Sequence, residues 1–247
     1  MIILIYKELF VKVYLLKDIN KKNINETLSN FVNYVMNKDS KLATIHTRNG
    51  YKRYSLSSLS PTENDGIYKK DEIYEFTIRG VDSNIIDKFE MVLKKERNEN
   101  FIVFDINKHL IDIKYIKELR SLTPAIITLK DEENNKLRCF NLLKDNIEIA
   151  QKKIFENLLK KYNFINKVNL KIEYNDIFEN INTMHEIAIV SNYKGIKLLG
   201  YKYLLEFKNN DISQSFAEIA LINGIAEKNT LSFGFTNKAK GVIKLVK

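Results

Sequence analysis

Strand-like and helix-like segments alternate along the 247-residue chain, and the same order of segments occurs twice. Segment 2–16 is rich in β-branched and aromatic residues, so we expect a long first strand there. Between 23 and 36, apolar residues recur three and four positions apart, which predicts a helix with one buried face. The other elements expected in the first half are a loop or hairpin at 44–59, a strand at 71–79, a helix at 81–95 and a strand at 101–104. This half therefore has the order β, α, β, β, α, β.

The second half is expected to repeat this order with additional or longer strands. Its expected elements are strands at 125–130 and 137–142, a helix at 147–162, strands at 168–174, 187–190 and 197–207, a helix at 213–222, and strands at 231–235 and 242–246. Only two prolines and eight glycines interrupt the chain, and no segment has the composition of a linker, so any domain boundary should be a short connection. We predict the α+β class, with two tandem ferredoxin-like (βαββαβ) domains at 1–120 and 121–247.

Composition excludes several kinds of protein. Cys139 is the only cysteine, so an internal disulfide and a multi-cysteine metal site are both excluded. No apolar run approaches the roughly 18 residues of a membrane span, and no basic start precedes an apolar stretch, so we expect no membrane partner, no signal peptide and a cytoplasmic location. The sequence has no Walker loop, no nucleophile elbow and no paired-carboxylate cluster of the kind that two-metal nucleases use. We therefore expect no metal and no cofactor.

Basic residues outnumber acidic residues by 40 to 31, which gives a formal net charge of +9. Three windows, 40–62, 187–205 and 228–247, contain no acidic residue, so their positive field is free to attract a polyanion such as RNA or DNA. A lysine-rich surface that binds nothing is the alternative interpretation. Tyrosines near these positions could stack on unpaired bases or could be packing residues of strands. The candidate RNA-binding residues are Arg48, Tyr51, Arg53, Lys194, Lys197, Lys202, Lys228, Lys238 and Lys240.

Of the three histidines, His46 is best suited to catalysis. It lies in an acid-free window beside the segment Arg48-Asn-Gly50, whereas His109 and His185 better suit surface or packing positions. A histidine can move protons to and from ribose oxygens near neutral pH. Lys52 and Arg48 would supply positive charge for a phosphate. These residue types suit cleavage of RNA without a metal ion.

Three separated segments contain the motifs that point to a known family. The first is His46-Thr-Arg-Asn-Gly-Tyr-Lys52, which is followed by Ser57-Ser-Leu-Ser-Pro61 and by an expected strand ending Phe76-Thr-Ile-Arg79. Thr123-Pro124 stands between the two halves, and near the C-terminus lies Gly224-Ile-Ala-Glu-Lys-Asn-Thr-Leu-Ser-Phe-Gly-Phe235. In this combination and order, the motifs resemble the CRISPR-associated endoribonucleases that cleave repeat RNA, members of the repeat-associated mysterious protein superfamily. The likeness spans nearly the whole chain.

The last segment resembles the glycine-rich loop of that family, with Gly224 and Gly234 retained. Ala226 and Ser232 stand where the family pattern has two further glycines. We expect these replacements to disfavour positive backbone φ and to reduce close approach to a phosphate.

The resemblance implies a metal-independent endoribonuclease that cleaves CRISPR repeat RNA in a precursor transcript, by attack of the ribose 2′-hydroxyl on the adjacent phosphate, and yields mature guide RNAs. It implies that His46 is the general base or acid and that Lys52 stabilises the phosphorane. A tyrosine is expected to help, with Tyr34 as the first choice and Tyr51 as the second. The alternative is a catalytically inactive RNA-binding subunit of a CRISPR surveillance complex. Repeat RNA is the expected partner, and other CRISPR-associated subunits and a homodimer are left open.

Overall fold

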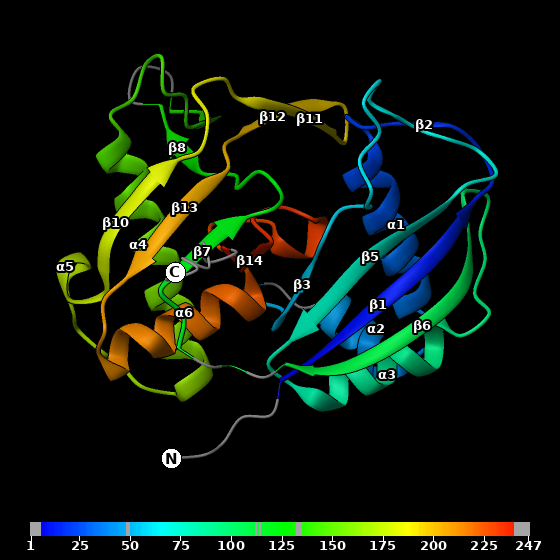
Figure 1. Cartoon of the computed structure of the whole chain (residues 1–247), viewed down its shortest axis with the longest axis horizontal. Coiled ribbons are helices and arrows are strands. Elements are labelled where there is room, and N and C mark those ends of the chain that lie inside the picture. Colours follow the sequence, from blue (N-terminus) through cyan, green and yellow to red (C-terminus); the bar gives the residue numbers. More distant parts are fainter. Residues whose placement is uncertain (1–5, 48–49, 112, 114, 132–134, 240–247) are drawn as a thin grey trace, which may run out of the picture.

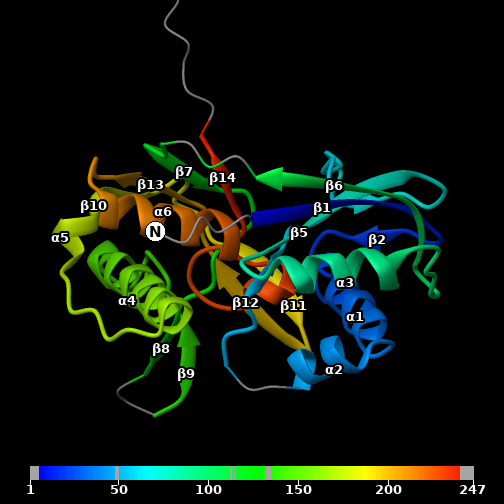
Figure 2. The ribbon, with the colours of Figure 1, turned by 90° about the horizontal axis from the view of Figure 1, so that it is seen from below.

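A computed structural model describes residues 6–47, 50–111, 113, 115–131 and 135–239. Four antiparallel strands form its first sheet, in the order β3-β5-β1-β6. The elements of this half are β1 (Tyr6–Leu15), α1 (Ile24–Met36), α2 (Ser40–Thr47), β3 (Tyr54–Leu56), β5 (Ile73–Gly80), α3 (Ser83–Leu93) and β6 (Phe101–Ile111). Alternate β1 residues such as Leu9, Val11 and Val13 are fully buried beneath the helices. Helices α1 and α3 lie on one face of the sheet (Figures 1 and 2).

A second four-stranded antiparallel sheet has the order β10-β13-β7-β14. Its elements are β7 (Glu118–Ser121), α4 (Ile147–Asn166), β10 (Phe178–Thr183), β13 (Tyr203–Phe207), α6 (Asp211–Asn223) and β14 (Thr236–Lys238). In each sheet the first strand of the half lies centrally, between the third and fourth strands, with the second strand at an edge. This is the ferredoxin-like order, so the predicted α+β class with two tandem ferredoxin-like units is confirmed.

Short elements are inserted into these two units. One is a two-stranded sheet of β2 (Ile19–Asn20) and β4 (Ile67–Tyr68). Two are hairpins, β8 (Thr128–Lys130) with β9 (Leu137–Cys139) and β11 (Ile189–Tyr193) with β12 (Ile196–Gly200). The others are α5 (Tyr174–Ile177) and a 3₁₀ turn η1 (Asn229–Leu231). Hairpin β11–β12 reaches from the second half to α1 (Figure 1). There the amide N–H of Asn192 donates to the carbonyl of Lys22 at 2.8 Å, so the hairpin ties the two halves together.

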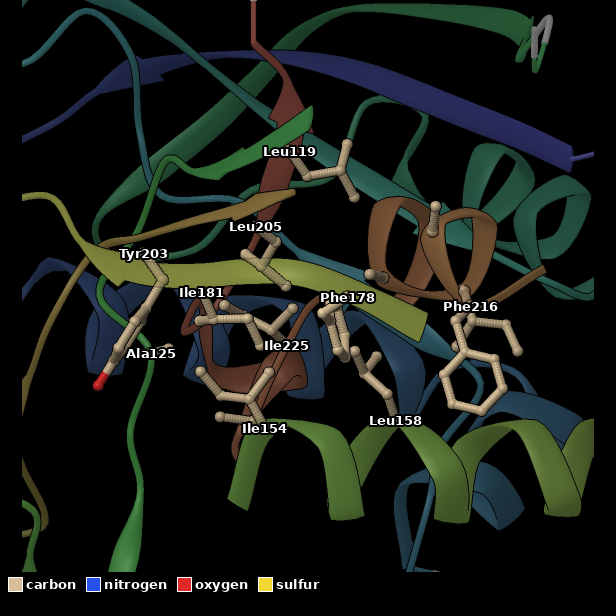
Figure 3. Close-up of a cluster of buried hydrophobic side chains, with 14 of the residues drawn as sticks. Leu119, Ala125, Ile154, Leu158, Phe178, Ile181, Tyr203, Leu205, Phe216 and Ile225 are labelled. Carbon is tan, nitrogen blue, oxygen red and sulfur yellow. The ribbon is translucent and has the colours of Figure 1, made fainter. Parts of the chain in front are cut away.

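Each half has its own apolar core. In the second half, α4 contributes Ile154 and Leu158, four positions apart, which pack with Phe178 and Ile181 from β10 (Figure 3). The two units also meet directly. Arg79 of β5, only 6% exposed, pairs with Glu8 at 2.7 Å and donates to the carbonyl of Thr236 at 2.7 Å.

Several expected elements differ from the structure. Segment 44–59, expected as a loop or hairpin, contains the end of α2 and the strand β3. Residues 40–47 form a helix because the Asp39 side chain caps its N-terminus. The expected strand at 168–174 is wrong: residues 168–173 are irregular, and the Asn163 side chain accepts the Leu170 amide at 2.9 Å. The expected strand at 231–235 is also wrong, because Ser232 and Gly234 have positive φ, which is incompatible with an extended strand.

The first strand of the second sheet is β7, which extends across the expected division at residues 120 and 121 and pairs with β13 and β14. The expected strand at 125–130 is present only as β8, in a hairpin outside the main sheet. The expected strand at 242–246 lies outside the described residues.

Candidate active site

His46 lies in the last turn of α2. This helix forms because the Asp39 carboxylate accepts the amides of Lys41 and Leu42 at 2.9 and 3.0 Å, and because the fully buried Leu42 packs into the first core. The imidazole is half-buried. Its Nδ1 atom is covered by protein and has no hydrogen-bond partner among the described residues. The helix thus holds the ring at its C-terminal end, next to the start of the segment that leads into β3.

Lys52 is bound to the same turn. Its Nζ atom donates to the main-chain carbonyl oxygen of His46 at 2.7 Å, which places a cation at the helix C-terminus, where the macrodipole favours it. Burial, together with the positive charge of Lys52, lowers the pKa of His46. Burial also lowers the pKa of Lys52. A histidine with a lowered pKa is neutral near pH 7 and can therefore accept a proton.

Tyr51 and Arg53 connect this segment to α4. The Tyr51 ring meets the Phe164 ring edge-on, with centroids 5.4 Å apart, and the Arg53 guanidinium lies 5.3 Å from the centre of the same Phe164 ring. The Tyr51 hydroxyl is covered and has no hydrogen-bond partner among the described residues. Burial raises the pKa of Tyr51, so its hydroxyl stays protonated.

A cavity of about 430 Å³ lies where this segment, α4 and the glycine-rich loop (residues 224–234) meet. Segment 50–54 contributes Tyr51 and Lys52, and the glycine-rich loop contributes Lys228. These three candidates, far apart in the sequence, therefore line one cavity. Lys160 and Lys161 of α4 complete its basic lining and were not among the candidates. A sequence signal existed, because Lys161 stands three and seven positions after Leu158 and Ile154, on the apolar face of the helix.

The glycine-rich loop turns back on itself. The amide of Ile225 donates to the carbonyl of Gly234 at 2.8 Å, and a Cβ on Gly234 would stand 2.1 Å from the Ile225 oxygen, so only glycine fits there. The expectation that the two replacements would disfavour positive φ is wrong: Ala226 and Ser232 adopt φ of 52° and 64°. The expected loss of close approach to a phosphate stays a prediction. The loop keeps its positive φ values because hydrogen bonds from surrounding groups hold it.

The remaining candidates lie elsewhere. Tyr34 is 44% exposed on α1, with the Lys38 amine 4.5 Å from its ring centre, and it does not line the cavity. Lys194 and Lys197 belong to the β11–β12 hairpin, and Lys238 ends β14.

Lys202 lines a second cavity, of about 530 Å³, with Lys21 and Lys22. Burial and the charges of Lys21 and Arg120 lower its pKa. Arg48 and Lys240 lie outside the described residues.

Comparison with known proteins gives a result for the fold. No protein-family model matches the chain, and no curated protein matches it in sequence. Among solved structures, a RAMP protein that binds different RNA substrates superposes with a TM-score of 0.75 at 18% identity, covering 95% of this chain and 100% of the other. A CRISPR-associated protein Cas6 gives 0.72 at 16% identity, with 95% and 100% covered. The product of a Cas6-related gene from Pyrococcus furiosus gives 0.72 at 18% identity, with 96% and 99% covered.

The chain shares the Cas6-related fold. The resemblance expected from the motifs is thereby confirmed in the structure, over nearly the full length of both chains. Within the described ranges, no helix is both long and apolar enough for a membrane span. In the same part of the chain, no three His, Cys, Asp or Glu side chains gather as a metal site would require.

Proposed function

We propose that this chain is an endoribonuclease that cleaves CRISPR repeat RNA in a precursor transcript, without a metal ion, and so yields mature guide RNAs. The observation that carries the proposal is the hydrogen bond from Lys52 to the main-chain carbonyl of His46. Lys52 lines the lysine-rich cavity, and this bond connects the cavity to the helix turn of His46, which does not itself line it. The shared fold adds support, because similar solved structures are described as an RNA-binding RAMP protein and a CRISPR-associated Cas6.

In the proposed reaction, His46 removes the proton from a ribose 2′-hydroxyl. The 2′-oxygen then forms a bond to the adjacent phosphorus while the bond from phosphorus to the 5′-oxygen breaks. Because Nδ1 of His46 is covered, we assign the proton transfer to Nε2. The products are a 2′,3′-cyclic phosphate and a 5′-hydroxyl, and no water is consumed.

Lys52 would stabilise the extra negative charge of the phosphorane, because its ammonium is fixed by the hydrogen bond to the His46 carbonyl before RNA binds. Protonation of the departing 5′-oxygen requires an acid, for which Tyr34 and Tyr51 are the two candidates. Tyr51 lines the same cavity as Lys52 but has a covered hydroxyl, whereas Tyr34 is exposed on α1.

The test is incubation of the purified chain with labelled repeat RNA from the source genome in the presence of EDTA. We expect one cut and a 2′,3′-cyclic phosphate end. His46→Ala should abolish the cut while RNA affinity changes little, and a 2′-deoxy substitution at the cut site should also block it. His109→Ala is the matched control, because that ring packs on Phe10 in the first sheet, 5.2 Å away.

Two results would contradict this proposal. Cleavage by His46→Ala at the wild-type rate would remove the catalytic assignment. Tight repeat binding without any cleavage would favour the inactive RNA-binding subunit instead.

A homodimer or other CRISPR-associated subunits would be detected by measuring the mass of the RNA-bound complex.

A further inference from the structure

Lys161 of α4 is a lysine enclosed within the protein. It is 5% exposed, and its Nζ atom donates to the carbonyl oxygen of Gly224 at 2.8 Å and to the Oδ1 atom of Asn229 at 2.7 Å. The carbonyl of Ala226 is a weaker acceptor at 3.4 Å. In the part of the chain that the structure describes, no carboxylate is among the hydrogen-bond partners of this amine. Its partners are therefore oxygens of the glycine-rich loop and, at 3.5 Å, the carbonyl of Asn223 just before the loop.

Burial of a lysine without a counter-ion is costly, and it lowers the pKa of Lys161 to about 7. The loop oxygens oppose this effect, because hydrogen bonds to an ammonium favour its charged form. The lysine and the loop therefore depend on each other. Without the loop the amine would be buried with no acceptors, and without the amine three inward-facing oxygens of the loop would lose a donor.

The loop needs such support because its backbone is unusual. Ala226, Lys228 and Ser232 all have positive φ, a conformation that is unfavourable for residues other than glycine. Asn229 braces the loop from inside, since its Nδ2 atom donates to the carbonyls of Ile225 at 2.8 Å and Phe233 at 3.0 Å. Lys161 donates to the Oδ1 atom of the same Asn229 side chain. The Asn229 amide therefore connects α4 to both ends of the loop.

The same loop forms one wall of the cavity in which Tyr51 and Lys52 form another. The position of this wall decides how far Lys228 lies from a phosphate held by Lys52. We propose that Lys161 is a positioning residue that fixes the glycine-rich loop at the RNA cavity. This inference rests on the proposed function, and it assigns Lys161 no contact with the reacting atoms.

The test compares Lys161→Met with Lys160→Met. Methionine fills the buried site without the charge, and Lys160 is an exposed neighbour on the same helix that lines the same cavity. Amide hydrogen exchange reports the loop, and thermal unfolding reports the whole fold. Affinity is measured with a labelled poly(U) oligonucleotide, and single-turnover cleavage with saturating repeat RNA from the source genome.

For Lys161→Met we expect faster exchange confined to residues 224–234 and a fall of at least tenfold in the single-turnover rate, with affinity reduced less than the rate. Lys160→Met should leave loop exchange as in the wild type and should weaken RNA affinity alone. Asn229→Ala removes the same contact from the loop side. If Lys161→Met does not fold, Asn229→Ala provides the test. We expect Asn229→Ala to show the same increase in exchange confined to residues 224–234.

Wild-type loop exchange in the variant that folds would overturn the inference. So would an unchanged single-turnover rate despite a loosened loop, or an increase in exchange spread evenly over the molecule, which would indicate a purely structural lysine. Hydrogen exchange is measured without RNA, so the exchange results test the role of Lys161 independently of the proposed function. The proposed function fails if the wild-type chain itself cleaves no repeat RNA.

Discussion

The amine of Lys52 lies 2.7 Å from the main-chain carbonyl oxygen of His46, and this contact joins a helix end to the segment that enters the sheet. The contact holds the Lys52 ammonium close to the His46 imidazole. The charge that lowers the pKa of His46 is thus fixed by the same helix turn that carries the ring. In the proposed reaction, the Lys52 ammonium would therefore keep His46 neutral as a base and would also stabilise the phosphorane.

Replacing Lys52 by methionine should lower the cleavage rate by about a hundredfold, the scale seen when one preorganised donor to a transition-state anion is lost. Lys52→Arg should retain part of the rate because the positive charge remains. The single-turnover rate with saturating RNA measures both. Lys41→Met is the control, since Lys41 is an exposed lysine of α2 in the same acid-free window. An equal loss in that control would point to a general charge effect.

The pH dependence follows from the lowered pKa of His46. If His46 is the base, the cleavage rate should rise with pH and level off below the ordinary histidine value of about 6.5. For stability, the folded chain binds a proton at His46 less readily than the unfolded chain does. The contribution of His46 to stability is therefore present above about pH 6.5 and decreases as pH falls through the lowered value. A rate that falls with rising pH in the acid range would instead identify His46 as the acid.

Gly234→Ala should destabilise the fold by at least about 3 kcal/mol, because the added Cβ would meet the Ile225 carbonyl oxygen as well as require a positive φ. Gly195→Ala at the tip of the β11–β12 hairpin is the matched control. Gly195 also has positive φ, but a Cβ there has nothing within 4 Å, so we expect only about 1 kcal/mol. Urea unfolding at equilibrium compares them. Equal losses would show that the close contact in the loop relaxes freely.

Arg79→Met should cost about 3–5 kcal/mol, because it leaves Glu8 without its ion-pair partner and removes the buried hydrogen bond to the Thr236 carbonyl that joins the two halves. Lys69→Met removes the exposed ion pair with Asp65 and should cost about 0–1 kcal/mol. Urea unfolding again provides the comparison. A loss for Arg79→Met as small as that for Lys69→Met would mean that the contact between the halves contributes little to stability.

RNA affinity should fall steeply with salt, because phosphate contacts release bound counter-ions. Lys228→Gln should reduce the slope of log affinity against log salt by about one, since Lys228 lines the cavity and would contact one phosphate there. Lys17→Gln is the control, because Lys17 lies 3.7 Å from Glu99 at the opposite end of the first sheet. An unchanged slope for Lys228→Gln would remove it from the RNA contacts.

Long elements were predictable from periodicity, and short ones were not. The helices expected at 23–36 and 147–162 correspond to α1 and α4, because their apolar residues recur with helical spacing over several turns. Strand β7 has only four residues and no clear alternation, so its place in the second sheet depends on tertiary pairing. Segment 231–235 has the composition of a strand, yet the loop contacts impose a different backbone.

The candidate site was predictable only where it is local in sequence. His46 and Lys52 are six positions apart, and their types alone suggested a joint role. The contribution of α4 to the cavity was not predicted, because it depends on how the second half packs against the first. A buried lysine on an apolar helix face was visible in the sequence, but its acceptors lie more than sixty positions away.

The internal bracing of residues 224–234 has a consequence for protein engineering. A graft of this segment onto another scaffold would bring along Asn229 but not the amine that steadies it, because Lys161 belongs to a helix encoded far upstream. Chimeras between proteins of this fold should therefore exchange helix and loop as one module. Swapping the loop alone would leave either a lysine without acceptors in the recipient or a transplanted turn without its internal donor.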